Sequence, residues 1–280
     1  MNFRKLVDKI FAIVVTLLAL LALIPVVHIT FYIVYKGLPT VLEEGWKFFV
    51  SVPAPATSPE PGGIGPALAG TITMATLATL IAVPISIAAA IFATELPSSF
   101  LARAVRATAR SLIEIPTILI GMLVFVLLVV PLGHYIGLAG AIALAIVMVP
   151  YVYTYTEQAL QQVPKTYIEA GYSIGLKRLE VIWLITLRMS SRGIARGITI
   201  GVSKAIGETA PLIFTVLGVR SAINFNPLEP MDATPLMIFH FIQTPFPSWQ
   251  KLAWGGAFVL LVLYLSVFIL SRMVVKEVRR

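Results

Sequence analysis

Residues 67–94 read ALAGTITMATLATLIAVPISIAAAIFAT and contain no charged side chain. A helix needs about 20 predominantly apolar residues to cross the hydrocarbon core of a bilayer, so this segment is long enough to span a membrane. Five further segments have the same apolar character: residues 10–35, 112–130, 138–156, 193–217 and 252–273. The sequence therefore predicts an all-α membrane protein with six transmembrane helices.

The composition excludes most other classes of protein. Of the 280 residues, 58% are hydrophobic and only 12% are charged, and the mean hydropathy is +0.93. Soluble domains carry roughly 25% charged residues, so this chain lacks the polar surface that water requires. A soluble enzyme and a nucleic-acid-binding protein are excluded. The absence of cysteine also excludes disulfides and thiolate metal ligands, and no metal site is expected.

Basic residues indicate the orientation, because the cytoplasmic ends of membrane helices are enriched in Lys and Arg. Sixteen of the 21 basic residues lie at one set of helix ends, whereas the opposite ends carry only Lys36, Lys47, Arg220 and Lys251. These ends alternate across six spans, which predicts that both termini are cytoplasmic. The expected units are a first helix with an extracytoplasmic loop (1–66), a five-helix core (67–273) with a cytoplasmic loop at 157–192, and a basic cytoplasmic tail (274–280).

The two outer loops are rich in proline. The density of proline at residues 52–63 disfavours a helix there, so an extended surface loop is expected. The second outer loop, at about 218–251, contains several aromatic residues. They are explained by anchoring at the membrane interface or by docking of an extracytoplasmic partner, and we favour anchoring.

The cytoplasmic loop at 157–192 has a helical pattern. Its apolar residues recur at a spacing that places them on one helical stripe: Ile168, Tyr172, Leu179, Ile182 and Trp183. Gly175 is suited to end a short first helix by adopting a left-handed conformation. Such an amphipathic segment either docks in the groove of a partner protein or lies on the membrane surface, and periodicity leaves both interpretations open.

Two charged residues lie inside the fifth predicted span. A charged side chain near the centre of a membrane helix costs about 2.5–3.5 kcal/mol, so Lys204 needs a compensating interaction. Glu208 follows one turn later on the same face, where the two side chains can form an ion pair. The pair is either a structural contact inside the bundle or a cation poised for an anionic substrate and tuned by Glu208. We favour the second interpretation.

Gly207 and Pro211 predict a bend in this span, because Pro211 has no N–H to donate to the carbonyl of Gly207. Thr209, between them, either donates its hydroxyl to the same anion or bonds back to a helix carbonyl, and the second is favoured. At the start of the third span, the run Glu114-Ile-Pro-Thr117 is explained by helix initiation, with a contact to a partner protein as the alternative.

The cytoplasmic loop also carries a recognisable spacing. The run Glu169-Ala170-Gly171, then three residues, Gly175, nine residues and Ile185-Thr186-Leu187 resembles the EAA loop of ABC importer permeases. Gly171 stands for the second alanine of that pattern. Arg188 replaces its final proline, so the loop is expected to run more continuously into the fifth span. The resemblance implies that this loop is a coupling helix in a groove of a cytosolic ATPase, acting through Glu169, Ala170, Gly171, Gly175, Ile185 and Leu187.

The fifth span resembles a more specific family. The run Lys204-Ala-Ile-Gly-Glu-Thr-Ala-Pro-Leu212 is similar to the Arg-Ala-x-Gly-Glu-Thr-Ala-Pro-Leu signature of the PstA family of phosphate-importer permeases. The second span agrees with this family at Gly70-Thr71, Pro84, residues 88–90 and Glu95. Lys204 stands where the family has arginine. A lysine still binds phosphate, but as a point charge rather than as a planar fork.

This resemblance implies the fold of a type I ABC importer permease with Lys204, Glu208 and Thr209 in the substrate path. One lysine cannot compensate hydrogen phosphate while Glu208 opposes the anion, so a second cation is expected from a PstC-like partner permease. The other implied partners are a PstB-like ATPase dimer, a PstS-like extracytoplasmic phosphate-binding protein and the lipid bilayer.

The chain itself is not expected to be an enzyme. It lacks the G-x-x-x-x-G-K-S/T phosphate loop, so ATP and Mg belong to the partner ATPase and this chain is expected to bind no cofactor. The alternatives are a permease of another oxyanion importer, for molybdate, tungstate or sulfate, and, less favoured, a secondary transporter or a membrane scaffold. The Gly-Glu-Thr-Ala-Pro-Leu run favours phosphate.

Overall fold

The computed structural model describes residues 3–277 and the side chains of residues 5–269. Helices make up most of this part of the chain, and its only β-type pairing is an isolated bridge between Pro53 and Gly62. Five of the basic side chains used to predict orientation lie outside the described side chains: Arg4, Arg272, Lys276, Arg279 and Arg280.

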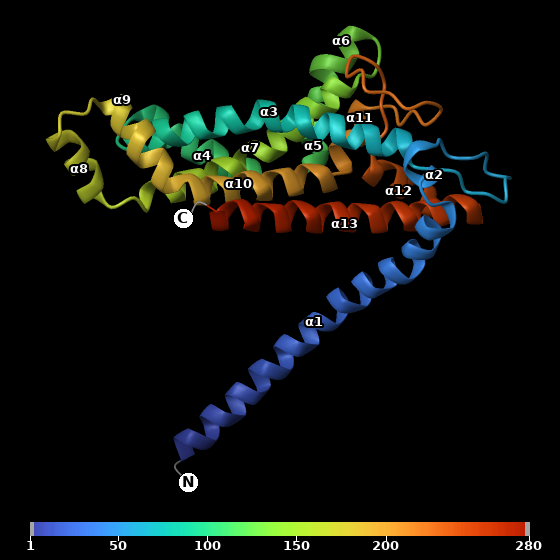
Figure 1. Cartoon of the computed structure of the whole chain (residues 1–280), viewed down its shortest axis with the longest axis horizontal. Helices are drawn as coiled ribbons and strands as arrows, with labels where there is room; N and C mark the ends of the chain where they lie inside the picture. Colours follow the sequence, from blue (N-terminus) through green and yellow to red (C-terminus); the bar gives the residue numbers. More distant parts are fainter. Residues whose placement is uncertain (1–2, 278–280) are drawn as a thin grey trace.

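Four long helices form the body of the molecule: α3 (Gly65–Glu95), α7 (Gly137–Gln161), α10 (Leu187–Gly207) and α13 (Pro247–Glu277). They lie side by side in Figure 1, with α7 against both α3 and α10, and with α10 against α13. Small and flexible apolar side chains, such as Ala78, Ala145 and Met148, fill the core between them. The helices α3, α7 and α13 confirm the apolar segments that begin near residues 67, 138 and 252.

Glycines bring α10 close to α7. A methyl group on Gly201 would lie 2.7 Å from Val152 and 2.8 Å from Met148, and one on Gly197 would lie 2.8 Å from Tyr155. Small residues allow membrane helices to pack backbone against side chain, which is a main source of their association. This close packing holds the part of α10 just before Lys204 against α7.

The first helix, α1 (Phe3–Glu44), diverges from the body, as Figure 1 shows. Only its C-terminal part packs, against α13 and the short helix α2 (Lys47–Val50). All large apolar side chains from Leu6 to Ile29 are exposed. A helix that is apolar and exposed on every side needs lipid or another membrane subunit around it.

The third predicted span is a pair of helices joined by a bend and not the single helix that was expected. Residues 112–114 belong to an amphipathic helix, α4 (Phe100–Glu114), and the apolar part begins at Thr117 after a bend of 106°. The reason is local: Pro116 has no N–H and forces Ile115 into an extended conformation, with φ −72° and ψ 127°. After the bend come α5 (Thr117–Val124), a π-helical segment η1 (Phe125–Val129) and α6 (Val130–Leu132).

Four described helices, α1, α3, α7 and α13, are long and apolar enough to cross a membrane. The bent segment from α4 to α6 makes five if it is counted as one span. The helix α10 does not join them because it carries Arg188, Arg192, Arg196 and Lys204. Six spans and cytoplasmic termini therefore stay predictions.

The loop at 157–192, which is predicted to be cytoplasmic, forms two helical segments that are separated by a turn. The first, α8 (Lys165–Ser173), ends in a turn in which Gly175 has φ +87°, which confirms the left-handed conformation predicted for this glycine. The second begins with α9 (Arg178–Val181) and continues without a break through the π-helical segment η2 (Ile182–Thr186) into α10. The continuity expected from Arg188 in place of a proline is confirmed.

The single apolar stripe predicted for this loop is wrong. Ile168 and Tyr172 lie on α8, whereas Leu179, Ile182 and Trp183 lie beyond the Gly175 turn. Ile182 is buried, while Leu179 and Trp183 are exposed. The turn at Gly175 separates the two sets, and the π-helical turn of η2 changes the spacing that the prediction assumed.

The proline-rich outer loop is extended, as predicted. The backbone N–H groups of Ala54 and Gly63 donate to the carbonyls of Pro61 and Val52, so the loop folds back on itself. The indole of Trp249 donates to the carbonyl of Ala54 over 2.9 Å and fastens the loop to α13. The second outer loop contains one helix, α12 (Thr234–Ile242), which packs on α13 and α3.

Candidate functional site

The candidate site lies where the fifth predicted span is interrupted. The helix α10 ends at Gly207, Glu208 is extended with φ −75° and ψ 132°, and α11 (Ala210–Thr215) begins two residues later. Pro211 lies in the first turn of α11, where a missing N–H costs nothing. The bend expected from Gly207 and Pro211 is thus a complete break. Lys204 lies in the last turn of α10 and not in the middle of a continuous helix.

Lys204 and Glu208 form an ion pair across this break. The Nζ atom of Lys204 is 2.5 Å from Oε1 of Glu208. The Lys204 side chain is 41% exposed, whereas that of Glu208 is 9% exposed. A cation at the C-terminal end of a helix also interacts favourably with the helix dipole. The arrangement buries the carboxylate and leaves part of the lysine side chain accessible.

Thr117 completes the surroundings of Glu208. Its hydroxyl donates to Oε2 of Glu208 over 3.1 Å, so both carboxylate oxygens are engaged. The helix α5 reaches this position because Gly121 lies directly on the backbone of Pro211, where a methyl group would be 2.5 Å from the Pro211 Cα. Neither helix initiation nor contact with a partner protein, the two interpretations of the run from Glu114 to Thr117, predicts this bond. The available signal was a hydroxyl residue directly after Pro116, at the start of an apolar helix.

A cavity of about 320 Å³ opens beside Lys204, between α7, α10 and α13, and we call it the Lys204 cavity. Its polar lining consists of Lys204 and four hydroxyl residues, Tyr151, Thr199, Ser203 and Tyr264. The apolar residues Ile200, Leu265 and Phe268 complete it.

Thr209 lies in a neighbouring cavity of about 560 Å³, between α1, α12 and α13, which Gly207 and Tyr264 also line. In the described part of the chain, the Thr209 side chain does not cap α11. The structure therefore separates Thr209 from the Lys204 cavity, although Tyr264 and Leu265 belong to both cavities.

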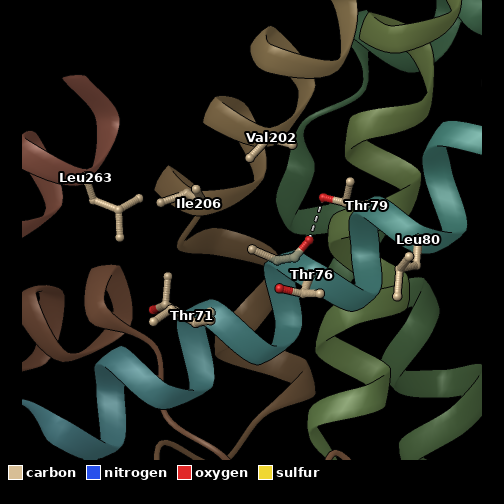
Figure 2. Close-up of a pocket in the computed structure, with 9 residues that line it drawn as sticks. Thr71, Thr76, Thr79, Leu80, Val202, Ile206 and Leu263 are labelled. Carbon is tan, nitrogen blue, oxygen red and sulfur yellow. Dashed lines mark hydrogen bonds between the residues drawn. The ribbon is translucent and has the colours of Figure 1, made fainter. Parts of the chain in front are cut away.

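A third cavity, of about 360 Å³, lies on the other side of the contact between α10 and α13. Figure 2 shows Thr71, Thr76 and Thr79 of α3 opposite Val202 and Ile206 of α10 and Leu263 of α13. The Thr79 hydroxyl donates to the carbonyl of Ala75 (Figure 2), and the Thr71 hydroxyl donates to that of Ala67 and accepts from the Thr234 N–H. Its lining holds no charged side chain, so this cavity does not suit an anion.

The six residues predicted to couple to an ATPase fall into two groups. Glu169 and Ala170 are exposed on α8, and Gly175 forms the turn after it. Gly171 is buried against Ile185, whose Cδ1 would be 2.6 Å from a methyl group on the glycine. Leu187 packs inward on a cluster of α3, α4 and α7 residues. The first group can contact a partner directly, whereas the second holds the loop together.

Ion pairs join this cytoplasmic end to the helices of the body. Arg178, the first residue of α9, contacts Glu95 at the end of α3, with Nε 2.9 Å from Oε2 and with Nη2 donating to the Glu95 carbonyl over 3.1 Å. Arg106 of α4 pairs with Glu157 of α7 at 2.6 Å. The loop at 157–192 is therefore joined to α3 as well as to α10.

A second charged cluster lies in the outer loop and was missed by the sequence analysis. The Nε of Arg220 is 2.8 Å from Oδ2 of Asp232, and its Nη2 is 2.6 Å from Nδ1 of His240. The Arg220 guanidinium also lies over the ring of Phe241. Burial raises the pKa of Asp232, and the Arg220 charge opposes this shift. Burial and the Arg220 charge both lower the pKa of His240.

Comparison with known proteins identifies the family. Residues 82–280 match the family described as binding-protein-dependent transport system inner membrane component. The chain is 44% identical, over 99% of its length and 96% of the relative, to a protein of Methanocaldococcus jannaschii named probable phosphate transport system permease protein PstA. It is 35% identical to PstA of Pasteurella multocida over 95% of this chain and 94% of that protein.

The fold is also similar to a solved structure. An inward-facing structure of the MetNI methionine ABC transporter aligns with a TM-score of 0.63 at 17% identity, covering 75% of this chain and 94% of that one. At this identity the likeness concerns the fold alone. The chain therefore belongs to the binding-protein-dependent transport system inner membrane components, and it is a multi-pass plasma-membrane protein with the fold of type I ABC importer permeases.

Proposed function

We propose that this chain is the transmembrane permease subunit of an ATP-driven phosphate importer and forms the translocation path with a second permease subunit. The observation that carries this proposal is the 44% identity, along almost the whole chain, to a relative named as a phosphate transport permease. Lys204 agrees with it, because a lysine with a partly exposed side chain inside a membrane helix bundle suits an anionic substrate.

The proposed path contains Lys204, Glu208 and Thr209. An arriving phosphate replaces part of the attraction that Glu208 exerts on the Lys204 ammonium, and the carboxylate limits how tightly the anion is held. A single lysine paired with a carboxylate cannot compensate a divalent anion. We therefore assign the second cation to the partner permease, which we expect to be PstC-like.

A permease subunit of an ABC importer works with an ATPase and with a substrate-binding protein. We assign these roles to a PstB-like ATPase dimer, which binds ATP and Mg, and to a PstS-like extracytoplasmic protein; this chain binds no cofactor. Support for ATPase docking comes from the apolar side chains that α8, the following turn, α9 and η2 expose, including Tyr172, Ile174, Leu179 and Trp183. The coupling loop comprises residues 157–192.

The proposed coupling follows the chain. The uninterrupted helix from Arg178 to Gly207 connects the docking surface to Lys204, and the contact between Arg178 and Glu95 connects the same surface to α3. When the ATPase dimer closes, a displacement of α8 and α9 tilts α10 and moves Lys204 relative to α5. Access to the Lys204 cavity then changes with the nucleotide state.

The test is uptake by proteoliposomes that contain this chain with its partner permease, ATPase and binding protein. We expect ATP-dependent accumulation of radiolabelled phosphate in preference to sulfate and molybdate. Lys204→Ala abolishes it, Lys204→Arg retains it, and Lys251→Ala, at the outer end of α13, leaves it unchanged. Preferential uptake of sulfate or molybdate, or uptake without ATP, overturns the proposal.

A further inference from the structure

We propose that Tyr151 and Tyr264 are the hydroxyl donors of an oxyanion site in the Lys204 cavity and that they set its preference among tetrahedral anions. This inference rests on the proposed function and names residues that neither the signature of the fifth span nor the coupling loop contains. Tyr151 lies on α7 and Tyr264 on α13, so the two donors approach Lys204 from different helices.

The first support is the charge of the cavity. Lys204 is the one charged residue in its described lining, and 41% of its side chain is exposed. An ammonium facing lipid at this depth is costly, so this face of α10 opens toward a polar path or another subunit. The cavity of about 320 Å³ has room for a small anion with some water, since one water occupies about 30 Å³ of the liquid.

The second support is the state of the hydroxyl groups. Thr199 donates to the carbonyl of Ala195 over 2.8 Å, so its hydroxyl is already used within α10. Among the described residues, the hydroxyls of Tyr151, Ser203 and Tyr264 have no hydrogen-bond partner. Ser203 lies on α10 one residue before Lys204, so only the two tyrosines bring donors from other helices. Both tyrosines are nevertheless close enough to interact electrostatically with Lys204. A cation with three uncommitted hydroxyl donors, two of them from neighbouring helices, is a suitable environment for an oxyanion, which requires donors when it leaves water.

The third support is the room left around Tyr264. A methyl group on Gly207 would lie 3.3 Å from Cε2 of Tyr264 and 3.9 Å from its hydroxyl. The missing side chain of Gly207 therefore makes space for the phenol beside the break. Because Tyr264 lines both the Lys204 cavity and the cavity that contains Thr209, its hydroxyl can contact an anion that passes from one to the other.

The cavity shown in Figure 2, which also borders α10, differs from the Lys204 cavity in its polar groups. Of the three threonines in that cavity, Thr71 and Thr79 donate to carbonyls of their own helix, whereas Thr76 has no hydroxyl partner among the described residues. The described lining of that cavity holds no cation. The Lys204 cavity thus combines a positive charge with free hydroxyl donors, and the neighbouring cavity of Figure 2 does not.

The experiment compares Tyr151→Phe and Tyr264→Phe with Thr199→Val in the complete importer complex, reconstituted in proteoliposomes. Each tyrosine variant removes one hydroxyl and keeps the ring. We expect each to raise the KM for phosphate about tenfold with little change in maximal rate, which is the effect of losing one hydrogen bond to a charged group. Thr199→Val removes a hydroxyl of the same cavity that is already committed, and we expect its KM to stay within twofold of the wild-type value.

Selectivity among anions provides a second measurement, which would not change if the two tyrosines acted only in packing. We expect the tyrosine variants to change the ratio of inhibition by arsenate, sulfate and molybdate, whereas Thr199→Val leaves it unchanged. Gly207→Ala crowds the Tyr264 ring at Cε2 and keeps the hydroxyl, so it should shift the phenol and raise the KM by a smaller factor. This variant keeps the test valid if Tyr264→Phe fails to assemble.

The outcomes separate this inference from the proposed function. Wild-type complexes that do not transport phosphate overturn the proposed function. Wild-type transport that Lys204→Ala abolishes, but that both tyrosine variants and Thr199→Val support equally, overturns the role of the tyrosines and leaves the proposed function standing.

Discussion

Thr117 donates a hydrogen bond to Glu208 over 3.1 Å and thereby connects α5 to the break between α10 and α11. The two residues are 91 positions apart in the chain. The carboxylate is held from two directions, since Lys204 occupies its other oxygen. The geometry of the Lys204 cavity thus depends on α5 as well as on α10.

Thr117→Val is expected to destabilise the protein and to impair transport. Valine has a similar shape, but it leaves a buried carboxylate oxygen without a donor, which costs about 1–3 kcal/mol. Thermal unfolding of the purified chain and phosphate uptake by the complex measure the two effects. Thr117→Ser retains the donor and should behave like the wild type.

Thr154→Val is the matched control, because the Thr154 hydroxyl donates to the carbonyl of Pro150 within α7. Equal unfolding temperatures and equal uptake for Thr117→Val and Thr154→Val contradict a role for the bond between Thr117 and Glu208.

Glu208→Gln is expected to lower the KM for phosphate and to lower the maximal rate of uptake. In the wild type the carboxylate competes with the anion for the Lys204 ammonium, 2.5 Å away. A neutral amide removes that competition, so phosphate binds more tightly and is released more slowly. Glu114→Gln, which removes an exposed carboxylate from the end of α4, serves as the control. An unchanged or raised KM in Glu208→Gln argues against this competition.

Local sequence signals predicted the elements that depend on neighbouring residues. The apolar run at 67–94 lies in α3. The turn that ends α8 contains Gly175, because glycine adopts a left-handed backbone conformation more readily than other residues. The sequence predicted the backbone conformation less well at two prolines, Pro116 and Pro211. Helix initiation at Pro116 is confirmed, because α5 begins at Thr117, but the single span expected over residues 112–130 is interrupted there by a bend of 106°. Pro211 was expected to bend a helix that in fact stops at Gly207.

Contacts between distant residues were not accessible to the same reasoning. Helix periodicity predicts the ion pair of Lys204 and Glu208 from their spacing of four residues, although the pair forms across the break, with Glu208 just beyond the end of α10. Thr117, Tyr151 and Tyr264 join them only because α5, α7 and α13 converge on one end of α10. No periodic pattern in a single chain encodes which face of one helix meets which face of another.

Stability is expected to fall as the pH falls below about 6.5, the ordinary pKa of histidine. A guanidinium only donates, so Nδ1 of His240 must be unprotonated to accept from Arg220. Burial and the Arg220 charge lower the pKa of His240 in the folded protein. The stability that neutral His240 contributes is therefore complete above the ordinary histidine pKa. It is lost as the pH falls from that value through the lowered pKa of His240 in the folded protein.

Thermal unfolding of the purified chain between pH 8 and pH 5 measures this effect, and His240→Gln should flatten the fall. Asp232 cannot produce it. Burial raises the pKa of that carboxyl, and a group with a raised pKa in the folded state loses stability as the pH rises. The same slope for the wild type and for His240→Gln contradicts the assignment to His240.

Substitutions of Gly171 are expected to separate packing of the cytoplasmic loop from its contact with the ATPase. A methyl group at this position lies 2.6 Å from Cδ1 of Ile185 and 3.2 Å from Cγ2 of Val181. The end of the isoleucine side chain can rotate away, so Gly171→Ala costs about 1 kcal/mol and retains uptake. Gly171→Leu has no such space and displaces α8 from η2, at a cost of about 3 kcal/mol.

Because the displaced helix carries Glu169 and Ala170, Gly171→Leu should lose the ATPase during co-purification while the two permease subunits stay together. Ser111→Leu, which adds the same side chain to an exposed position of α4, should retain both the ATPase and uptake. If Gly171→Leu purifies with a full complement of ATPase and transports at the wild-type rate, the packing of Gly171 against Ile185 is not what presents α8 to the ATPase.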